Sequence, residues 1–105
     1  MKDEILYISE TYKQGNLFIH SIAEKLESIG TDFKIDIHKM FIETGKYKII
    51  VVPINGTNLG CSKSRVKYFL NCSGLYDEKF NRWFFFHECT EEIHSINEII
   101  DIVRC

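Results

Sequence analysis

Two polar loops hold the residues best suited to bind a ligand. The first, Ser9 to Asn16, is rich in hydroxyl and amide groups, has Glu10 as its only acid and leads into the expected start of a helix. The free amide groups and the dipole at a helix N-terminus favour an anion, so this loop predicts a phosphate site. The second, Asn55-Gly56-Thr57-Asn58-Leu59-Gly60, is rich in residues that tolerate positive φ angles. Such a loop lets a flat ring approach the backbone closely.

Other residues could carry chemistry, although each also has a simpler structural explanation. Cys61 stands near an expected helix start, which lowers a thiol pKa, and His87 ends an expected strand where it could exchange a proton. A small residue at a helix start more often serves packing, and a strand histidine more often makes a structural hydrogen bond. Cys89 and His94 join His87 as metal-ligand types, but a fourth ligand at a matching spacing is missing.

Three apolar runs and one alternating segment predict the strands that must position these loops. Ile5–Ile8 and Tyr47–Val52 are continuous runs typical of strands buried on both faces of a parallel sheet, and Pro53 ends the second. Residues 32–38 alternate between polar and apolar, which favours a strand near a sheet edge with one wet face. The aromatic run Trp83–Phe86 predicts a fourth strand.

Three further segments have the apolar spacing of helices. The first starts at Leu17, with Asn16 as its N-cap, and stops at Gly30. Its expected buried stripe consists of Phe18, Ile22, Leu26 and Ile29. The second helix is expected within 62–70. Its basic face, which is usually solvated but could dock an acidic partner, consists of Lys63, Arg65 and Lys67.

The last helix is expected to follow Thr90 as its N-cap. Glu91 and Glu92 would then lie at its positive N-terminal end, where acids are favourable. Its expected buried stripe consists of Ile93, Ile96, Ile100 and Val103.

These elements alternate as strand, helix, strand, strand, helix, strand and helix, which predicts one α/β domain covering residues 1–105. The link from His38 to Lys46 is too short for a parallel crossover, unless Lys39–Thr44 forms a single helical turn. We expect a small open parallel sheet of four strands in the order 2-1-3-4, flanked by helices. Such sheets bind ligands beyond the carboxyl ends of the first and third strands, where both polar loops lie.

The composition excludes several functions. The 105 residues include 13 Lys and Arg against 15 Asp and Glu, a net charge of −2, which is too balanced for the counterion release that drives general nucleic-acid binding. No window approaches the roughly 18 apolar residues needed to cross a bilayer. Asp3 and Glu4 stand where a signal peptide would be basic. We therefore expect a cytoplasmic protein with free thiols that binds neither nucleic acid nor membranes.

The first loop and its flanks resemble the phosphate-binding segment of flavodoxins. Ile5-Leu6-Tyr7-Ile8-Ser9-Glu10-Thr11, followed by Gly15-Asn16 and Phe18-Ile19, is similar to their pattern of strand, S-x-T, G-N and helix, with Tyr12-Lys13-Gln14 inserted. The likeness continues through residues 49–53, 56–60 and 66–71. These resemble the third strand, glycine-bearing loop and following helix of the small flavodoxin-like proteins that activate manganese ribonucleotide reductases.

This resemblance implies a flavodoxin-like fold that binds FMN and transfers electrons to a redox partner protein. It implies that Ser9, Thr11 and Asn16, with Gly15 in the same loop, hold the phosphate. The residues implied to lie beside the flavin ring are Asn55, Gly56, Thr57, Asn58 and Gly60.

Departures from the family pattern leave two alternatives open. A helix is expected directly after His87-Glu88-Cys89, where flavodoxins have a glycine-rich flavin loop and a fifth strand. The chain could therefore be a cofactor-free flavodoxin-like module that binds a regulatory partner. It could also be a TIR-like interaction domain, with Glu88 or Glu43 as an acid of unknown role. The aromatic strand Trp83–Phe86, at a sheet edge, further predicts a homodimer formed by edge-to-edge pairing.

Overall fold

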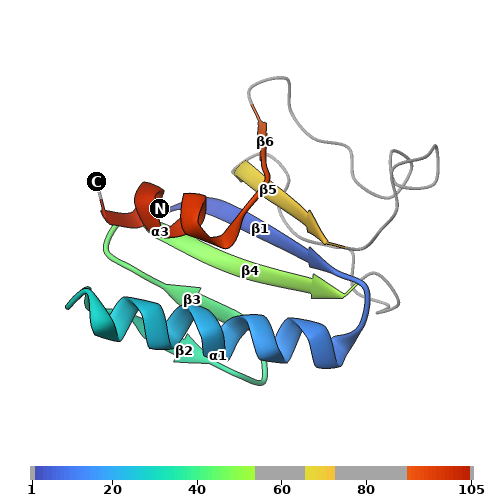
Figure 1. Cartoon of the computed structure of the whole chain (residues 1–105), viewed down its shortest axis with the longest axis horizontal. Coiled ribbons are helices and arrows are strands. Elements are labelled where there is room, and N and C mark those ends of the chain that lie inside the picture. Colours follow the sequence, from blue (N-terminus) through green and yellow to red (C-terminus); the bar gives the residue numbers. More distant parts are fainter. Residues whose placement is uncertain (1, 54–65, 73–89, 105) are drawn as a thin grey trace.

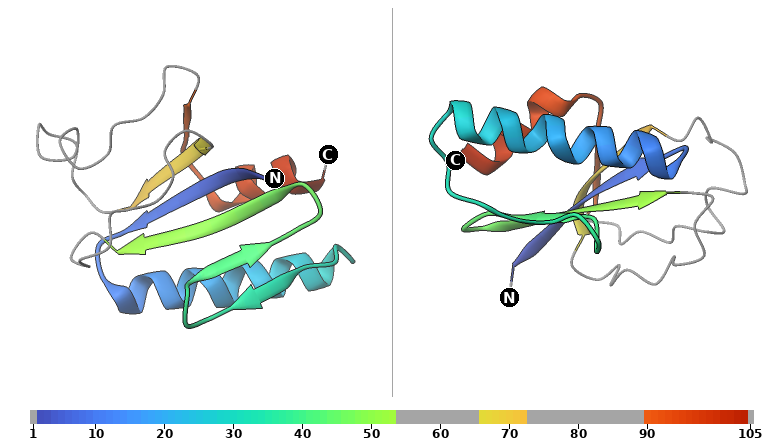
Figure 2. Two further views of the ribbon diagram at one scale, coloured as in Figure 1. Left: turned by 180° about the vertical axis from the view of Figure 1, so that it is seen from behind. Right: turned by 90° about the horizontal axis from the view of Figure 1, so that it is seen from below.

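The structure is a computed structural model that describes residues 2–53, 66–72 and 90–104. These residues form one sheet of six strands, in the spatial order β2-β3-β4-β1-β5-β6, and two helices (Figure 1). Both helices, α1 (Tyr12–Ser28) and α3 (Ile96–Arg104), lie on the same side of the sheet, as the right-hand view of Figure 2 shows. The mixed α/β class predicted from the sequence is confirmed.

Three parallel strands form the centre of the sheet: β1 (Asp3–Ser9) lies between β4 (Tyr47–Pro53) and β5 (Val66–Cys72). The side chains of Leu6 and Ile8 have no solvent-exposed surface. Because alternate residues of a strand point to opposite faces, Tyr7 points the other way, into the core formed with the helices. The apolar run of β1 is therefore buried on both faces, as its composition predicts, whereas β4 combines buried and partly buried positions.

Helix α1 covers the sheet with an apolar stripe. Its buried residues are Gly15, Phe18, Ile19, Ile22 and Leu26. Ile29, expected in this stripe, follows the last turn and is 37% exposed. Gly30, at φ 75°, ends the helix: its N–H donates to the Glu27 carbonyl, and the Thr31 N–H donates to the Leu26 carbonyl. This pair of bonds is a Schellman motif, in which glycine supplies the left-handed conformation.

The start of α1 corrects the sequence prediction. The helix begins at Tyr12 rather than Leu17, and Thr11 rather than Asn16 is its N-cap. Thr11 has an extended backbone, and its hydroxyl accepts a hydrogen bond from the Gln14 N–H. The polar segment that was expected to be a loop is therefore mostly helix.

The chain between α1 and β4 corrects the predicted strand order. The outer strand β2 (Lys34–Asp36) pairs antiparallel with β3 (Phe41–Glu43), which pairs antiparallel with β4. The strand predicted over 32–38 therefore lies far from β1, and the order 2-1-3-4 for the predicted segments is not confirmed. The physical reason is the short link to β4, which permits tight antiparallel turns but no parallel crossover.

Two segments predicted as helix are strands. Residues 66–70 belong to β5, which pairs parallel with β1 on one side and with β6 (Glu91–Ile93) on the other. Thr90 does not cap a helix: its hydroxyl donates to the Val66 carbonyl at 2.7 Å and ties the start of β6 to β5. The strand predicted at Trp83–Phe86 lies outside the described residues.

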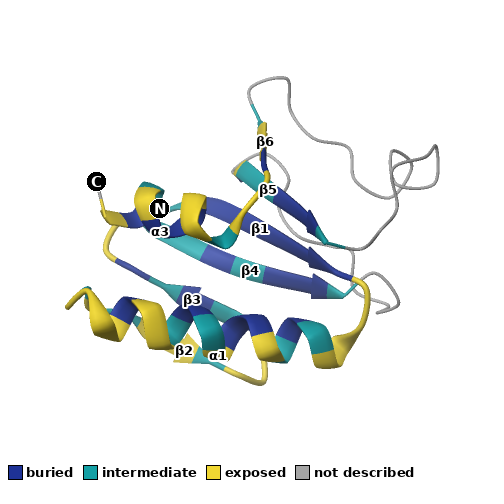
Figure 3. Ribbon diagram, viewed as in Figure 1, coloured by how far each residue is buried: buried dark blue, intermediate teal, exposed yellow. Residues whose placement is uncertain are grey.

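Helix α3 starts after Ser95 and packs against α1. The Ser95 N–H donates to the Glu98 carboxylate at 2.9 Å, and the Glu98 N–H donates back to the Ser95 hydroxyl at 3.3 Å. This reciprocal pair is a capping box. The buried residues of α3 are Ile99, Ile100 and Val103. Figure 3 shows the buried positions concentrated on the central strands and on the inner sides of the helices. Among the described residues, no helix is long and apolar enough to traverse a bilayer.

Candidate functional site

The carboxyl ends of β1, β4 and β5 meet at one edge of the sheet. Ser9, the last residue of β1, pairs with Pro53 of β4 on one side and with Cys72 of β5 on the other. Helix α1 begins shortly after Ser9, so its N-terminus lies at the same edge (Figure 1). Open parallel sheets bind ligands at such an edge. We refer to Ser9, Cys72 and the first turn of α1 with its N-cap Thr11 as the candidate site.

A set of hydrogen bonds holds the start of α1 in place. The Ser9 hydroxyl donates to the Thr11 carbonyl at 2.9 Å, and the Thr11 hydroxyl accepts from the Gln14 N–H at 3.1 Å. The Gln14 side-chain carbonyl in turn accepts from the Glu10 N–H at 2.6 Å. Both hydroxyl groups that were predicted to hold phosphate therefore have partners within the turn itself.

The first turn of α1 favours a negatively charged ligand. It contains no acidic residue, and Lys13 lies exposed within it. The amides of Tyr12 and Lys13 lie ahead of the first intrahelical donor, and the helix dipole adds partial positive charge at this end. Tyr12, the first residue of the helix, is 53% exposed. The arrangement can accept an anion from solvent.

Gly15 has a packing role at this edge. A Cβ on Gly15 would lie 2.6 Å from Val51 Cγ1, 2.9 Å from Met40 Cε and 3.1 Å from Ser9 Oγ. Helix α1 thus approaches β4 too closely for a side chain at this position. The structure brings Ser9, Thr11 and Gly15 together, as the sequence pattern suggested, but in a strand end, an N-cap and a helical turn.

Asn16 lies next to Gly15 in α1 and is partly buried. Its side-chain oxygen is buried and has no hydrogen-bond partner within the described part of the chain. Asn16 is separated from the N-cap by a full helical turn, so it is not part of the free helix end that would face an anion.

Sequence reasoning missed Tyr7 and Cys72. Tyr7 is 5% exposed and stacks on Phe18 of α1, with ring centroids 3.6 Å apart and an interplanar angle of 8°. Burial, together with a hydrogen bond to Cys72, raises the pKa of the Tyr7 phenol above its ordinary value. Cys72 is a partly buried free thiol. The two residues are remote in sequence, and only the pairing of β5 with β1 connects them.

Several predicted functional residues lie outside the described residues, so the structure does not place them. They are Asn55, Gly56, Thr57, Asn58, Gly60, Cys61, Lys63, Arg65, His87, Glu88 and Cys89.

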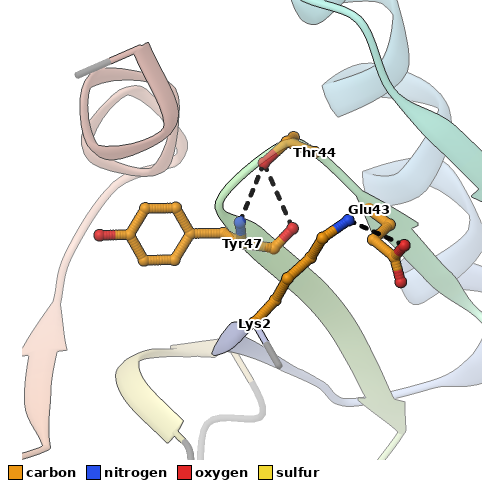
Figure 4. A network of polar contacts seen from close by, with 4 residues as sticks. All are labelled: Lys2, Glu43, Thr44 and Tyr47. Carbon is orange, nitrogen blue, oxygen red and sulfur yellow. Dashed lines mark hydrogen bonds and ion pairs between the residues drawn. The ribbon is translucent and has the colours of Figure 1, made fainter.

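The opposite, amino-terminal end of the sheet carries paired charges. Lys2 Nζ lies 3.0 Å from Glu43 Oε2, and Lys67 Nζ lies 3.3 Å from Asp3 Oδ2. The hydrogen bond from Lys2 lowers the pKa of Glu43. Figure 4 shows the Lys2 contact beside the β3–β4 turn. Glu43 is therefore remote from the carboxyl edge, and Lys67 lies on a strand rather than on the predicted basic helix face.

In the same turn, the Thr44 hydroxyl accepts from the Tyr47 N–H and donates to the Tyr47 carbonyl, both at 3.2 Å (Figure 4). These bonds close the turn that leads into β4. Their role is structural, because they connect neighbouring residues within one hairpin.

No three His, Cys, Asp or Glu side chains are grouped to hold a metal ion in residues 2–53, 66–72 and 90–104. Comparisons with protein-family models, with curated proteins and with solved structures found no match to this chain. Function must therefore be inferred from the candidate site itself.

Proposed function

We propose that this protein binds a phosphate-bearing ligand at the candidate site, and that the ligand is FMN, used for electron transfer to a partner protein. One observation carries the proposal. Helix α1, whose first turn has no acidic residue, begins at the topological switch point of the sheet, where successive connections run to opposite sides of β1. After β1 and α1 the chain forms β2, β3 and β4 on one side of β1, and then crosses to form β5 on the other side. Flavodoxin-like sheets bind their cofactor at such a switch point.

The residues at the start of α1 fit the phosphate end of such a ligand. The amides of Tyr12 and Lys13 supply donors, the Lys13 ammonium supplies charge, and the bonds of Ser9 and Gln14 keep the turn in shape. The exposed Tyr12 ring is available to contact a flat group. FMN would supply the redox chemistry, while this chain binds and orients it. In this proposal the residues beside the flavin ring are those of the second polar loop, 55–60.

Titration of the purified protein with FMN, followed by quenching of flavin fluorescence, tests the proposal. FMN should bind at least about tenfold more tightly than riboflavin, which lacks the phosphate. Lys13→Glu should weaken FMN binding by about tenfold, because a carboxylate in the first turn repels the phosphate. The same carboxylate stabilises the helix, so this variant should stay folded.

Lys25→Glu is the matched control, because it makes the same charge change in the last turn of α1. It should leave the FMN affinity unchanged. The proposal is refuted if the wild-type protein does not bind FMN, or if Lys13→Glu binds FMN as well as the wild type does.

One observation favours a second function, that of a cofactor-free interaction module. The Ser9 and Thr11 hydroxyls already have partners in the turn, whereas a phosphate loop presents such groups to its ligand. In this alternative the flavodoxin-like or TIR-like scaffold serves contacts with a regulatory partner. Failure of the wild-type protein to bind FMN would select it.

A further inference from the structure

The outer strand β2 presents an open edge of the sheet. It pairs with β3 on one side, and within the described part of the chain no strand pairs with its other side. Figure 2 shows it as the last strand on that side of the sheet, beyond β3. Lys34 is exposed, and Ile35 is 40% exposed. A strand with unpaired backbone groups at a sheet edge is a template for pairing with another strand.

The segment that contains this edge carries several exposed apolar side chains. Three large hydrophobic residues that are more than one-third exposed fall within residues 29–37: Ile29 at 37%, Ile35 at 40% and Ile37 at 38%. They come from the end of α1, from β2 and from the turn that follows it. Of these residues, Ile35 lies on the edge strand itself, where its exposed surface can contact a partner strand.

We propose that a second copy of this chain pairs with β2, strand against antiparallel strand, to form a symmetric dimer. The sequence of the edge is complementary to itself in this arrangement. With two Ile35 residues opposite each other, Lys34 of each copy lies opposite Asp36 of the other. The chain turns at residues 37–40, so the pairing is confined to the three residues of β2. Within β2, every opposed pair is either apolar or of opposite charge.

The same pattern disfavours other arrangements of the edge. In a parallel, in-register pairing, Lys34 would face Lys34 and Asp36 would face Asp36, which places like charges opposite each other. The antiparallel pairing is isologous and closes after two copies, so it does not continue into a fibre. The charges of β2 thus favour a closed antiparallel dimer and disfavour parallel, in-register stacking of many copies.

Within the chain, Lys34 lies opposite Glu43 of β3, and Asp36 keeps one carboxylate oxygen for a further partner. Asp36 uses one carboxylate oxygen to accept from the Lys39 N–H at 3.0 Å, which leaves its second oxygen for an incoming ammonium group. Ile35 pairs across β3 with Ile42, which is fully buried in the core. Two Ile35 residues in contact therefore continue the core of one copy into the other. Because β2 has three residues, the interface is small and the association weak.

Sedimentation equilibrium over a concentration series up to about 1 mM tests the proposal, because small interfaces require high concentration. The wild-type chain should shift from monomer to dimer within this range. Lys34→Asp should weaken the dimer by at least about tenfold, since two symmetric pairs become repulsive. Arg104→Asp makes the same charge change in the last turn of α3 and should leave the dimer unaffected.

A charge swap distinguishes loss of the dimer by charge repulsion from loss of the dimer by unfolding. Asp36→Lys alone should also abolish the dimer, partly because the turn loses its bond to the Lys39 N–H. The double variant K34D/D36K restores opposite charges and should dimerise again, and an equimolar mixture of K34D with D36K should form heterodimers. A wild-type chain that stays monomeric throughout, a dimer unchanged by K34D, or single variants that do not associate when mixed would each overturn the proposal.

Discussion

Replacing Gly15 by alanine should lower the free energy of unfolding by about 1 kcal/mol, the opposite of its usual effect in a helix. Alanine is normally about 1 kcal/mol more favourable than glycine within a helix. Here the added Cβ would lie 2.6 Å from Val51 Cγ1 and 2.9 Å from Met40 Cε. The Met40 methyl is the end of a flexible chain and can move, but Val51 is a short side chain on the central strand β4. Overpacking of this kind costs roughly 1–3 kcal/mol, which exceeds the helical gain.

A double-mutant cycle with Val51→Ala measures this contact. Val51→Ala alone should cost about 2 kcal/mol, because it removes buried methyl groups. In that background the closest contact of the new Cβ is gone and the flexible Met40 methyl can move aside, so Gly15→Ala should stabilise the protein by up to about 1 kcal/mol. The sign of the Gly15→Ala effect therefore reverses between the two backgrounds. Urea unfolding followed by far-ultraviolet circular dichroism provides all four free energies.

Gly45→Ala is the matched control, because a Cβ at Gly45 would meet no atom within 4 Å. It should change the free energy of unfolding by less than about 0.5 kcal/mol. If Gly15→Ala stabilises the protein in the wild-type background, or if its effect is the same with and without Val51, the packing explanation is wrong. If it leaves stability unchanged but removes FMN binding, Gly15 serves the ligand instead.

Two further predictions concern titration and capping. The pKa of Tyr7 is raised by burial and by Cys72, so the folded protein keeps a proton that the unfolded chain loses near pH 10. The free energy of unfolding should therefore be fully retained below about pH 10 and fall at higher pH. Tyr7→Phe should reduce this fall above about pH 10, and equal slopes for both proteins would contradict the assignment. Ser95→Ala should lower the free energy of unfolding by about 1 kcal/mol through loss of the N-cap of α3, whereas Ser95→Asp should retain most of it. Urea unfolding measures both, and an unchanged midpoint for Ser95→Ala would show that the capping box does not stabilise α3.

Two short apolar segments that the sequence predicts as helical are strands in this fold. The spacing of Val66, Phe69 and Leu70 fits one face of a helix, yet these residues lie in β5 between two parallel strands. A short apolar run fits either period, and the presence of a neighbouring strand decides between them. The same holds for Ile93, which looked like the start of a helical stripe but pairs with Leu70 in the sheet.

The candidate site was predictable in part. The sequence pointed to the carboxyl end of β1 and to Ser9 and Thr11, and the structure brings these two residues together at the start of α1. It could not show that their hydroxyls are used within the turn, because that depends on the helix beginning at Tyr12. It also could not identify Cys72, which reaches Ser9 only through the pairing of β5 with β1.

The α/β class, the strands β1 and β4, the apolar stripe of α1 and its end at Gly30 could all be predicted from the amino-acid sequence. These features follow from local composition and spacing, which act over a few residues. Tertiary structure alone decided the sheet order, the strand identity of β5 and β6, and the packing role of Gly15. Each of these depends on which distant strand lies alongside, because backbone hydrogen bonds and close packing between segments remote in sequence outweigh the local preference of a short run.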